Sequence, residues 1–336
     1  MMSSSAHHSD LKISVLGAGA WGTALANVAA RTGAKVQLWG RDATHIAHVS
    51  QERQNAKHLP GIKLEETITP TSNLAEAAKA DLILAVVPAQ ALRQLCEQIK
   101  AHIAPSIPVV ICAKGIERST RAFLSDVVKE ILPHNPPAIL SGPSFAVDVA
   151  RGLPTAVTLA AADEHLARHI AAKLAIPSFR LYHSTDLRGV EIGGAAKNVL
   201  AIACGIAAGR SLGASAGAAL VARGFAELNR FAQAHGARPE TLMGLSGLGD
   251  LVLTCGSTQS RNYAFGLALG QGASLSQASG AKLAEGAFTA SVLVEMAQAA
   301  GIDMPIAQSI DLVLSERITI GEAIESLLLR PSKSEV

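Results

Sequence analysis

The stretch KISVLGAGAWG, residues 12–22, decides the fold of the first part of this chain. Its first five letters are typical of a short buried strand, and Gly17, Gly19 and Gly22 then follow the pattern G-x-G-x-x-G. The first glycine allows a tight turn, the second lets a pyrophosphate approach the backbone, and the third lets a helix pack closely on the strand. Because an Ala-rich helix follows directly, the stretch predicts the opening βαβ unit of a dinucleotide-binding domain.

Short apolar runs alternate with helical segments as far as about residue 184. Runs of this kind are typical of a parallel sheet with both faces covered. Strands are predicted at 35–39, 82–87, 109–113, 138–140, 155–160 and 179–183, and helices at 21–31, 74–79, after Pro88, and at 121–132, 144–150 and 164–173. From about Asp186 onward such runs nearly vanish and long Ala/Leu/Glu helices dominate. The sequence therefore predicts an α/β Rossmann-type domain with a parallel sheet, residues 10–186, and an all-α domain, residues 187–330.

The end of the second predicted strand, LWGRD at 38–42, bears on the choice of cofactor. An acidic residue here would hold the ribose 2′-hydroxyl of NAD, whereas an arginine accommodates the 2′-phosphate of NADP. Arg41 occupies this place, so NADP is favoured, and the neighbouring Asp42 keeps NAD open as a second cofactor. Asp42 has an alternative role as the N-cap of the following helix.

The composition limits the classes of partner and location. The 336 residues are 49% hydrophobic and carry a formal net charge of +2 without a dense Lys/Arg stripe, which argues against nucleic-acid binding. The four cysteines form no CxxC, so each is expected to pack as a small hydrophobe in a reducing cytoplasm. No His/Cys group has the spacing of a metal site, and the start MMSSSAHHSD does not read as a signal peptide.

The segment 198–222 contains a single charge, Arg210, and is long enough to suggest a membrane span. It is rich in Gly, Ala and Ser rather than in Leu, Ile and Phe, and the arginine falls at its centre. We therefore expect a buried helix or helix pair, and no integral membrane association.

Two segments follow predicted strands at the edge where an open α/β sheet binds its ligands. The first is AKG, with Lys114, and the second is SGPS, with Gly142 and Ser144. Lys114 either points toward a ligand or is a solvated loop lysine. Ser144 either serves only as the N-cap of the helix FAVDVA or contacts a ligand as well.

The stretch EIGGAAKNVL, residues 191–200, places Lys197 beside an apolar segment, where an ammonium group is costly to desolvate. On a helix, Gly193 and Gly194 share its face and leave room for a ligand or for another backbone. A functional lysine is favoured over one that reaches water from the surface.

Two later segments supply groups that suit such a lysine. GLSGLGDLVLTC, residues 244–255, contains Asp250, which either serves as a helix N-cap or turn residue or pairs with a buried lysine as its anion. SRN, residues 260–262, contains Arg261, whose fork geometry suits phosphate, and Asn262 as a further donor. The alternative for Arg261 is a surface arginine without a ligand.

Six segments in this order, GAGAWG, SGPSFA, GGAAKN, GLGDL, SRN and AEG, resemble those of bacterial NAD(P)-dependent glycerol-3-phosphate dehydrogenase. The resemblance covers about residues 12–328 and implies a Rossmann domain followed by a helical domain. It also implies the reversible reduction of dihydroxyacetone phosphate to sn-glycerol 3-phosphate, which feeds phospholipid synthesis. The departures are small: Asp148 stands where glutamate is usual, and Ala284 where valine is common.

The same resemblance implies roles for individual residues. Lys197 matches the proton-transferring lysine, with Lys114 and Asp250 as its catalytic companions. The implied substrate contacts are Lys114, Gly142, Ser144, Lys197, Asp250, Ser260, Arg261 and Asn262, with Arg261 as the phosphate anchor. The expected cofactor contacts, which include the three fingerprint glycines, are Gly17, Gly19, Ala20, Trp21, Gly22, Arg41, Lys114, Ala146, Arg261, Leu283 and Glu285.

Two other functional classes stay open. Another NADPH-dependent 2-ketoacid or β-hydroxyacid reductase would place its basic anchor elsewhere than in SRN. A non-catalytic dinucleotide sensor would have no need of Lys197 or Asp250. For the dehydrogenase that the six segments resemble, the expected partner is a small-molecule substrate, dihydroxyacetone phosphate or sn-glycerol 3-phosphate. A homodimer is left open, because the Ala/Gly-rich helices could pack between subunits or within one.

Overall fold

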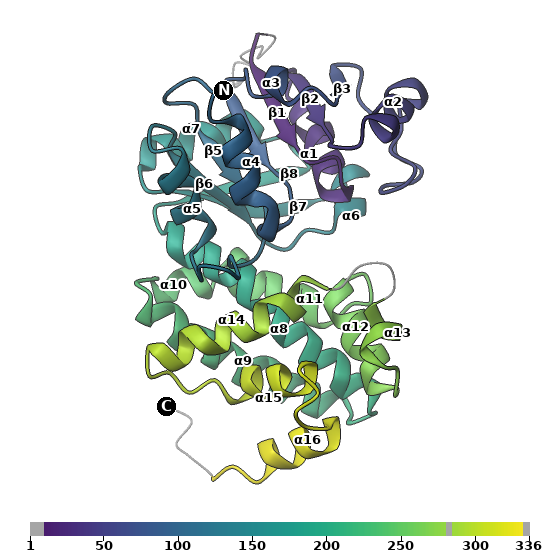
Figure 1. Cartoon of the computed structure of the whole chain (residues 1–336), viewed down its shortest axis with the longest axis vertical. Coiled ribbons are helices and arrows are strands. Elements are labelled where there is room, and N and C mark those ends of the chain that lie inside the picture. The colour runs from purple at the N-terminus through teal and green to yellow at the C-terminus, as the bar shows by residue number, and fades with distance from the viewer. Residues whose placement is uncertain (1–9, 280–283, 332–336) are drawn as a thin grey trace. The chain divides into compact units, whose positions relative to one another are not determined.

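The computed structural model describes residues 10–279 and 284–331 and consists of two compact units (Figure 1). The first unit comprises the chain up to Glu117 together with Ala122–Glu191, and the second comprises Arg118–Arg121 and the chain from Ile192 onward. The first, an α/β unit, is called the sheet domain below, and the second is called the helical domain. Each is described by itself.

The sheet domain contains an eight-stranded sheet in the order β3-β2-β1-β4-β5-β6-β7-β8. The strands are β1 Lys12–Leu16, β2 Lys35–Trp39, β3 Ile68–Thr71, β4 Leu82–Ala85, β5 Val109–Ile111, β6 Pro137–Ser141, β7 Thr155–Ala161 and β8 Phe179–Ser184. The order of the first six is that of the dinucleotide-binding Rossmann fold, in which the strand order reverses between β1 and β4. The predicted α/β fold class is thus confirmed.

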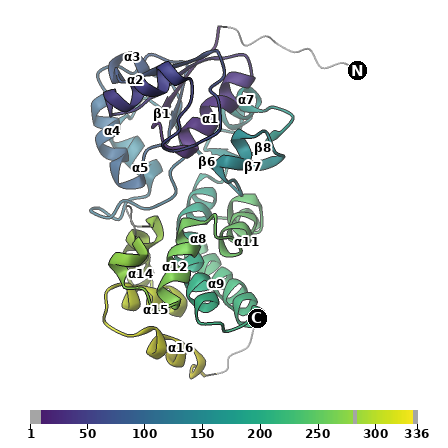
Figure 2. The same cartoon turned by 90° about the vertical axis from the view of Figure 1, so that its right-hand side faces the viewer.

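Helices cover both faces of this sheet, as the sequence predicted. One apolar core joins a face of the sheet to α1, α2, α6 and α7, and another joins the opposite face to α3, α4 and α5. Figure 2 shows α4 and α5 on one side of the strands and α7 on the other. The helices are α1 Ala20–Arg31, α2 Ala43–Glu52, α3 Leu74–Ala77, α4 Leu92–Ile99, α5 Leu124–Ile131, α6 Ala146–Ala150 and α7 Glu164–Leu174, with a short 3₁₀ turn, η1, at Ala89–Ala91.

The predicted parallel sheet has one exception, the ladder between β6 and β7, which is antiparallel. The connection between them contains only the five-residue helix α6, which extends about 7 Å. A parallel crossover has to return the chain along the whole strand, about 16 Å for five residues. α6 instead packs on α1, where the Arg31 side chain donates to the Ala150 carbonyl at 3.0 Å, and the chain re-enters the sheet from the same edge.

Two elements of the sheet domain were not predicted, β3 and α2. The edge strand β3 reads ITPT, and Pro70 within it lacks the backbone donor that usually marks a strand. The helix α2 reads ATHIAHVSQE and buries only Ile46 and Val49, so its apolar periodicity is faint.

The helices that follow are α8 Leu187–Gly209, α9 Ala214–Ala234, α10 Pro239–Leu242, α11 Asp250–Cys255, α12 Arg261–Gly270, α13 Leu275–Ser279, α14 Glu285–Ala299, α15 Pro305–Leu314 and α16 Ile320–Leu328, with a π-helical turn, η2, at Leu245–Gly249. They form the helical domain, except that α8 belongs to the sheet domain as far as Glu191. Glycine sets the spacing of α8 and α12, which lie side by side (Figure 2). A Cβ on Gly205 would lie 2.2 Å from the Tyr263 carbonyl oxygen, and one on Gly266 would lie 2.1 Å from that of Ile202. With few aromatic side chains to fill the space between helices, the helical domain packs its backbones closely together.

The apolar segment 198–222 is divided between two helices with different environments. It comprises the end of α8 and the start of α9, separated by a break at 210–213. α8 is long and apolar enough to cross a membrane, yet 89% of its most apolar window is buried inside the protein, as in the core helix of a globular domain. The expectation of burial holds for α8 and is wrong for the start of α9, where Ala214, Ala218 and Ala222 are exposed.

Candidate active site

The glycine turn after β1 has the geometry that the fingerprint predicts. Gly17 has a φ of +130°, and a Cβ there would lie 2.6 Å from the Val86 carbonyl oxygen that follows β4. A Cβ on Gly22 would lie 1.8 Å from the Gly17 oxygen, so helix α1 approaches the turn this closely only because residue 22 is glycine. A Cβ on Gly19 would meet no atom of the described residues within 4 Å. The fold therefore does not require glycine there, whereas a pyrophosphate against the backbone would.

Ala20 and Trp21 follow this turn as the first residues of α1. The indole Nε1 of Trp21 is buried and has no hydrogen-bond partner among residues 10–279 and 284–331. A buried donor without a partner is costly, and a ligand at the turn would offer it acceptors. These residues fit a bound dinucleotide.

The alternatives for Arg41 and Asp42 are resolved in part. Asp42 is the N-cap of α2, and its Oδ1 accepts a hydrogen bond from the His45 amide at 3.0 Å. That hydrogen bond lowers the pKa of the Asp42 carboxyl, and the Lys57 ammonium adds to the effect. The predicted capping role is thus confirmed. Arg41 is exposed, and its guanidinium has no partner in the described part of the chain.

Lys114, Gly142 and Ser144 lie together at the carboxyl ends of β5 and β6. The Lys114 ammonium donates to the Gly142 carbonyl at 3.2 Å, and the Ser144 hydroxyl donates to the same oxygen at 3.0 Å. Lys114 is therefore not a freely solvated loop lysine. The N-cap role of Ser144 is wrong, because α6 begins at Ala146 with Phe145 as its N-cap. The Ser144 side chain instead bonds back to its own turn.

Lys197 is buried, so the surface alternative for it is wrong. Its side chain is 5% exposed and pairs with the carboxylate of Asp250, which is 1% exposed. The ammonium also donates to Thr254 Oγ1 at 2.7 Å, and the Thr254 hydroxyl donates to Asp250 Oδ1 at 3.3 Å. Three side chains from α8 and α11 are thus joined in one buried polar network of the helical domain.

The backbone around Gly193 explains how α11 comes so close to Lys197. A Cβ on Gly193 would lie 2.6 Å from the Ser246 carbonyl oxygen, so the room above α8 is filled by the backbone of η2. Such π-helical turns are rare and are often found at functional sites. The N-cap role for Asp250 is wrong, because Gly249 precedes α11 as its N-cap and Asp250 is the first helical residue. The predicted role as the anion of a buried lysine is confirmed.

The SRN segment begins α12. The Ser260 hydroxyl accepts a hydrogen bond from the Tyr263 amide at 3.3 Å and caps the helix. Asn262 Oδ1 accepts from the Gly286 amide at 2.9 Å, which ties SRN to the AEG segment at the start of α14. Arg261 is exposed and has no hydrogen bond or ion pair with the described residues, so its fork is open to an anion.

Of the two cofactor candidates near the start of α14, the structure describes only Glu285. Glu285 is the first residue of α14, next to the amide that Asn262 holds. Leu283 lies outside the described residues.

Sequence reasoning missed Thr254. It lies four residues after Asp250 on the helix α11, so both side chains project from one face toward Lys197. This i, i+4 spacing of an acid and a hydroxyl, once the acid was assigned to the lysine, is the signal that would have identified it.

The predicted character of the cysteines is confirmed. All four are buried and none is in a disulfide. Burial raises the pKa of the Cys96 thiol to about 12, so this residue is a small hydrophobe rather than a nucleophile at neutral pH.

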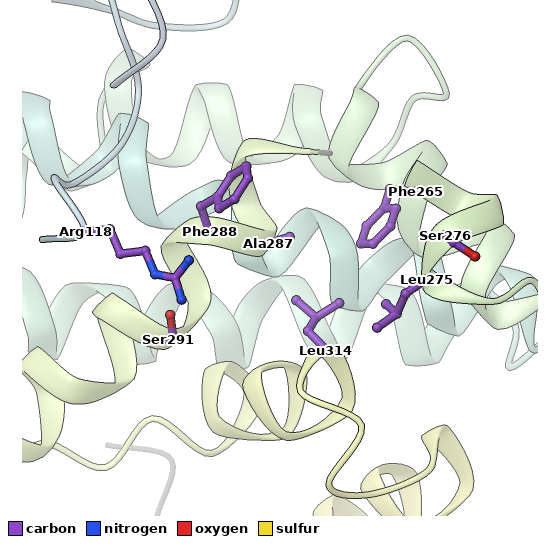
Figure 3. Close-up of a pocket in the computed structure, with 8 residues that line it drawn as sticks. All are labelled: Arg118, Phe265, Leu275, Ser276, Ala287, Phe288, Ser291 and Leu314. Carbon is purple, nitrogen blue, oxygen red and sulfur yellow. The ribbon is translucent and has the colours of Figure 1, made fainter. Parts of the chain in front are cut away.

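A separate cavity of about 320 Å³ lies within the helical domain (Figure 3). Its walls are mainly apolar, and Figure 3 shows Arg118 and Ser291 together at one end of it. Its lining residues are Arg118, Phe265, Leu275, Ser276, Ala287, Phe288, Ser291 and Leu314. None of these is a predicted site residue, so this cavity is distinct from the Lys197 network.

Known proteins are similar to this chain along nearly its whole length. Family profiles for the N-terminus and the C-terminus of NAD-dependent glycerol-3-phosphate dehydrogenase match residues 12–167 and 186–325. The chain is 61% identical to a glycerol-3-phosphate dehydrogenase (NAD(P)+) of Azorhizobium caulinodans, over 96% of this chain and 98% of the relative.

Solved structures give the same result. A crystal structure of glycerol-3-phosphate dehydrogenase from Coxiella burnetii superposes with a TM-score of 0.92 at 39% identity, covering 96% of this chain and all of that one. The glycerol-3-phosphate dehydrogenase of Saccharomyces cerevisiae superposes with a TM-score of 0.82 at 26% identity, covering 94% of this chain and 98% of that one.

Proposed function

The chain belongs to the NAD-dependent glycerol-3-phosphate dehydrogenase family, and we propose that it reduces dihydroxyacetone phosphate reversibly to sn-glycerol 3-phosphate with NADP as the preferred cofactor and NAD as the second. The single observation that carries this proposal is the buried Lys197–Asp250–Thr254 network. A fold has little reason to bury a lysine at such desolvation cost unless its proton is used. The product would feed phospholipid synthesis.

We assign to Lys197 the proton that the reaction requires. When bound, the reduced nicotinamide supplies a hydride to the ketone carbon. Lys197 gives a proton from its ammonium to the ketone oxygen, and takes one back in the reverse direction. Asp250 and Thr254 fix the direction of the Lys197 side chain, and the ammonium stabilises negative charge as it develops on that oxygen.

The substrate phosphate is assigned to the start of α12. Arg261 offers an open guanidinium fork there, and Ser260 and Asn262 are the flanking contacts. Binding energy at the phosphate would orient the carbonyl for reaction. In the sheet domain, Lys114, Gly142 and Ser144 are proposed as further substrate contacts, with Lys114 assisting catalysis as a second cation.

The cofactor is assigned to the glycine turn of the sheet domain. The supporting observations are the positive φ of Gly17, the open space at Gly19 and the unpartnered indole nitrogen of Trp21. The full set proposed for this role is Gly17, Gly19, Ala20, Trp21, Gly22, Arg41, Lys114, Ala146, Arg261, Leu283 and Glu285.

Oxidation of NADPH, followed by its absorbance, tests the reaction. Wild type should turn over dihydroxyacetone phosphate and not 2-ketoacids. Turnover of a 2-ketoacid alone would establish the competing reductase class, and no turnover of either would favour a sensor. Lys197→Ala should lower kcat by about a thousandfold or more while NADPH still binds, since proton donors contribute factors of this order. A kcat near that of wild type would remove Lys197 from the mechanism.

The location and assembly are part of the proposal. A cytoplasmic location is supported by four buried, unbridged cysteines, which suit a reducing compartment. A homodimer is supported by the exposed small residues at the start of α9, which would allow close approach of a second copy. Sedimentation equilibrium distinguishes monomer from dimer.

A further inference from the structure

We propose that Lys57 is a second cation, beside Arg41, that holds the 2′-phosphate of NADP and so contributes to the preference of this chain for NADP over NAD. The inference rests on the proposed function only in that a dinucleotide binds at the glycine turn. No sequence motif contains Lys57, which lies in the irregular segment 53–59 after α2. The fold brings it to the cofactor.

The place of the 2′-phosphate follows from the sheet register. Leu16 at the end of β1 pairs with Trp39 at the end of β2, and the Gly17 amide donates to the Trp39 carbonyl at 2.9 Å. The residues that follow Trp39 therefore leave the sheet directly beside the glycine turn. In this fold the adenosine ribose lies at that place, so groups around Arg41 and Asp42 meet its 2′ position.

The segment 53–59 folds back onto the same place and is held there firmly. Arg53 ends α2 with a φ of 51° and donates to the carbonyls of Ile68 at 2.8 Å and Glu65 at 2.7 Å. Asn55 is fully buried, and its Nδ2 donates to the Ala18 carbonyl of the glycine turn at 2.9 Å. The segment is thus bonded directly to the turn that receives the pyrophosphate.

Lys57 lies between two fixed points of this segment. The amides of His58 and Leu59 both donate to the Asn55 carbonyl, at 3.2 and 2.8 Å, which makes a compact turn. The ring of His58 meets the ring of His45 edge-on, with centroids 5.2 Å apart, and His45 belongs to the first turn of α2. Lys57 is exposed and directly precedes His58, whose ring meets the first turn of α2, and the charge of its ammonium helps lower the pKa of the Asp42 carboxyl.

The charges of Arg41 and Asp42 cancel, so a second cation is needed beside them to attract the 2′-phosphate. The Asp42 carboxylate caps α2 and would repel a phosphate on the adjacent ribose. Arg41 alone would only offset that charge, whereas Arg41 and Lys57 together leave a net positive charge for a phosphate dianion. NAD has no group at the 2′ position for Lys57 to contact, so the contribution is specific to NADP.

Titration of the full chain with reduced nicotinamides, followed by their fluorescence, tests the proposal. Lys57→Gln should weaken NADPH binding about tenfold, the usual scale for one charge-assisted phosphate contact, and leave NADH binding within about twofold. The loss should shrink as salt is raised. Lys63→Gln, which removes an exposed lysine of the same connection between α2 and β3, is the matched control and should change neither affinity.

Equal weakening of NADPH and NADH by Lys57→Gln would overturn the proposal, because the lysine would then contact a part common to both. Unchanged binding of both would overturn it as well. Arg41→Ala in the same titration tests the first cation separately. Failure of the proposed reaction would appear as absent turnover of dihydroxyacetone phosphate, while the difference between NADPH and NADH binding would still be measurable.

Discussion

Two buried charges of one apolar helix, Glu191 and Lys197, are satisfied in different ways. Glu191 accepts from the Ser125 amide at 2.9 Å, from the Ser125 hydroxyl at 2.7 Å and from Arg188 at 3.3 Å. Ser125 belongs to the first turn of α5, so this carboxylate caps a helix that would otherwise end in open donors. Glu191 is bound into the backbone of the sheet domain.

The partners of Lys197 described above are side chains, Asp250 and Thr254, on one short helix. A carboxylate that caps a backbone amide supports the fold, whereas a lysine held by side chains is positioned at a desolvation cost that the fold does not need. Burial alone therefore does not identify a catalytic charge. Glu191 and Lys197 differ in whether the main chain or side chains hold them, so substitutions of the two residues should have different consequences.

The largest effect is expected from Asp250→Asn. The Lys197 ammonium would stay buried without its anion, and turnover should fall about a thousandfold. The free energy of unfolding should fall by about 3 kcal/mol, the usual cost of breaking one side of a buried pair. Steady-state kinetics and urea denaturation measure the two. A turnover above one tenth of wild type would show that Asp250 does not position Lys197.

Glu227 in the helical domain resembles Glu191, because its carboxylate also accepts hydrogen bonds from backbone amides at the start of a helix. It should make the stability of the protein depend on pH. It is buried on α9 and accepts from the amides of Ile306 at 2.9 Å and Ala307 at 3.3 Å, at the start of α15. Burial raises the pKa of its carboxyl to about 7, against the weaker opposing effects of those amides and of Arg230, and Asp303 raises it further.

Because the folded pKa lies above the unfolded one, the folded state binds the proton more tightly. This contribution to stability is complete below about pH 4.5 and is lost as the pH rises through about 7, by up to about 3 kcal/mol. Glu227→Gln should remove that part of the pH dependence. Urea midpoints between pH 5 and 8 measure it, and identical slopes for variant and wild type would contradict it.

Glu191→Gln should cost about 2 kcal/mol in the free energy of unfolding, because an amide cannot accept from all the donors that face it. Turnover should stay within about threefold of wild type, since no proposed chemistry uses this carboxyl. Thermal unfolding and kcat, measured on the same preparation, separate the two effects. A loss of activity without loss of stability would show that Glu191 serves catalysis, as Lys197 is proposed to do, and not the fold.

Among substitutions within the Lys197 network, Thr254→Val should have the smallest effect on turnover, a loss of about tenfold, because the ammonium loses one acceptor and keeps Asp250. KM for dihydroxyacetone phosphate should change little, since Thr254 acts through Lys197. Thr254→Ser, which retains the hydroxyl, is the matched control and should restore most of kcat. Equal losses in the Val and Ser variants would contradict this role, because Ser retains the hydroxyl.

The sequence was sufficient for much of the sheet domain because its information is local. Gly17, Gly19 and Gly22 specify a turn, and five-residue apolar runs specify the strands. The antiparallel β7 was missed because ladder direction depends on where a connection packs, here α6 on α1. The edge strand β3 was missed because Pro70 and the short length weaken its pattern.

The pairing of Lys197 with Asp250 was predicted from chemistry, since a buried ammonium requires an anion and the GLGD segment offered one. Thr254 was missed because its i, i+4 spacing from Asp250 has meaning only once Asp250 is assigned to Lys197. The role proposed for Lys57 was out of reach for a different reason. It depends on backbone packing between segments, Asn55 on Ala18, and such a contact leaves no spacing rule in the sequence.

The most direct test of the central claim replaces the whole pair, in the variant Lys197→Met/Asp250→Leu. If the pair exists for chemistry, the variant should fold, unfold at a urea midpoint equal to or above that of wild type, bind NADPH normally and show no turnover of dihydroxyacetone phosphate. A variant that retains turnover would contradict the catalytic role. One that is less stable by several kcal/mol would show that the pair supports the fold, as Glu191 does.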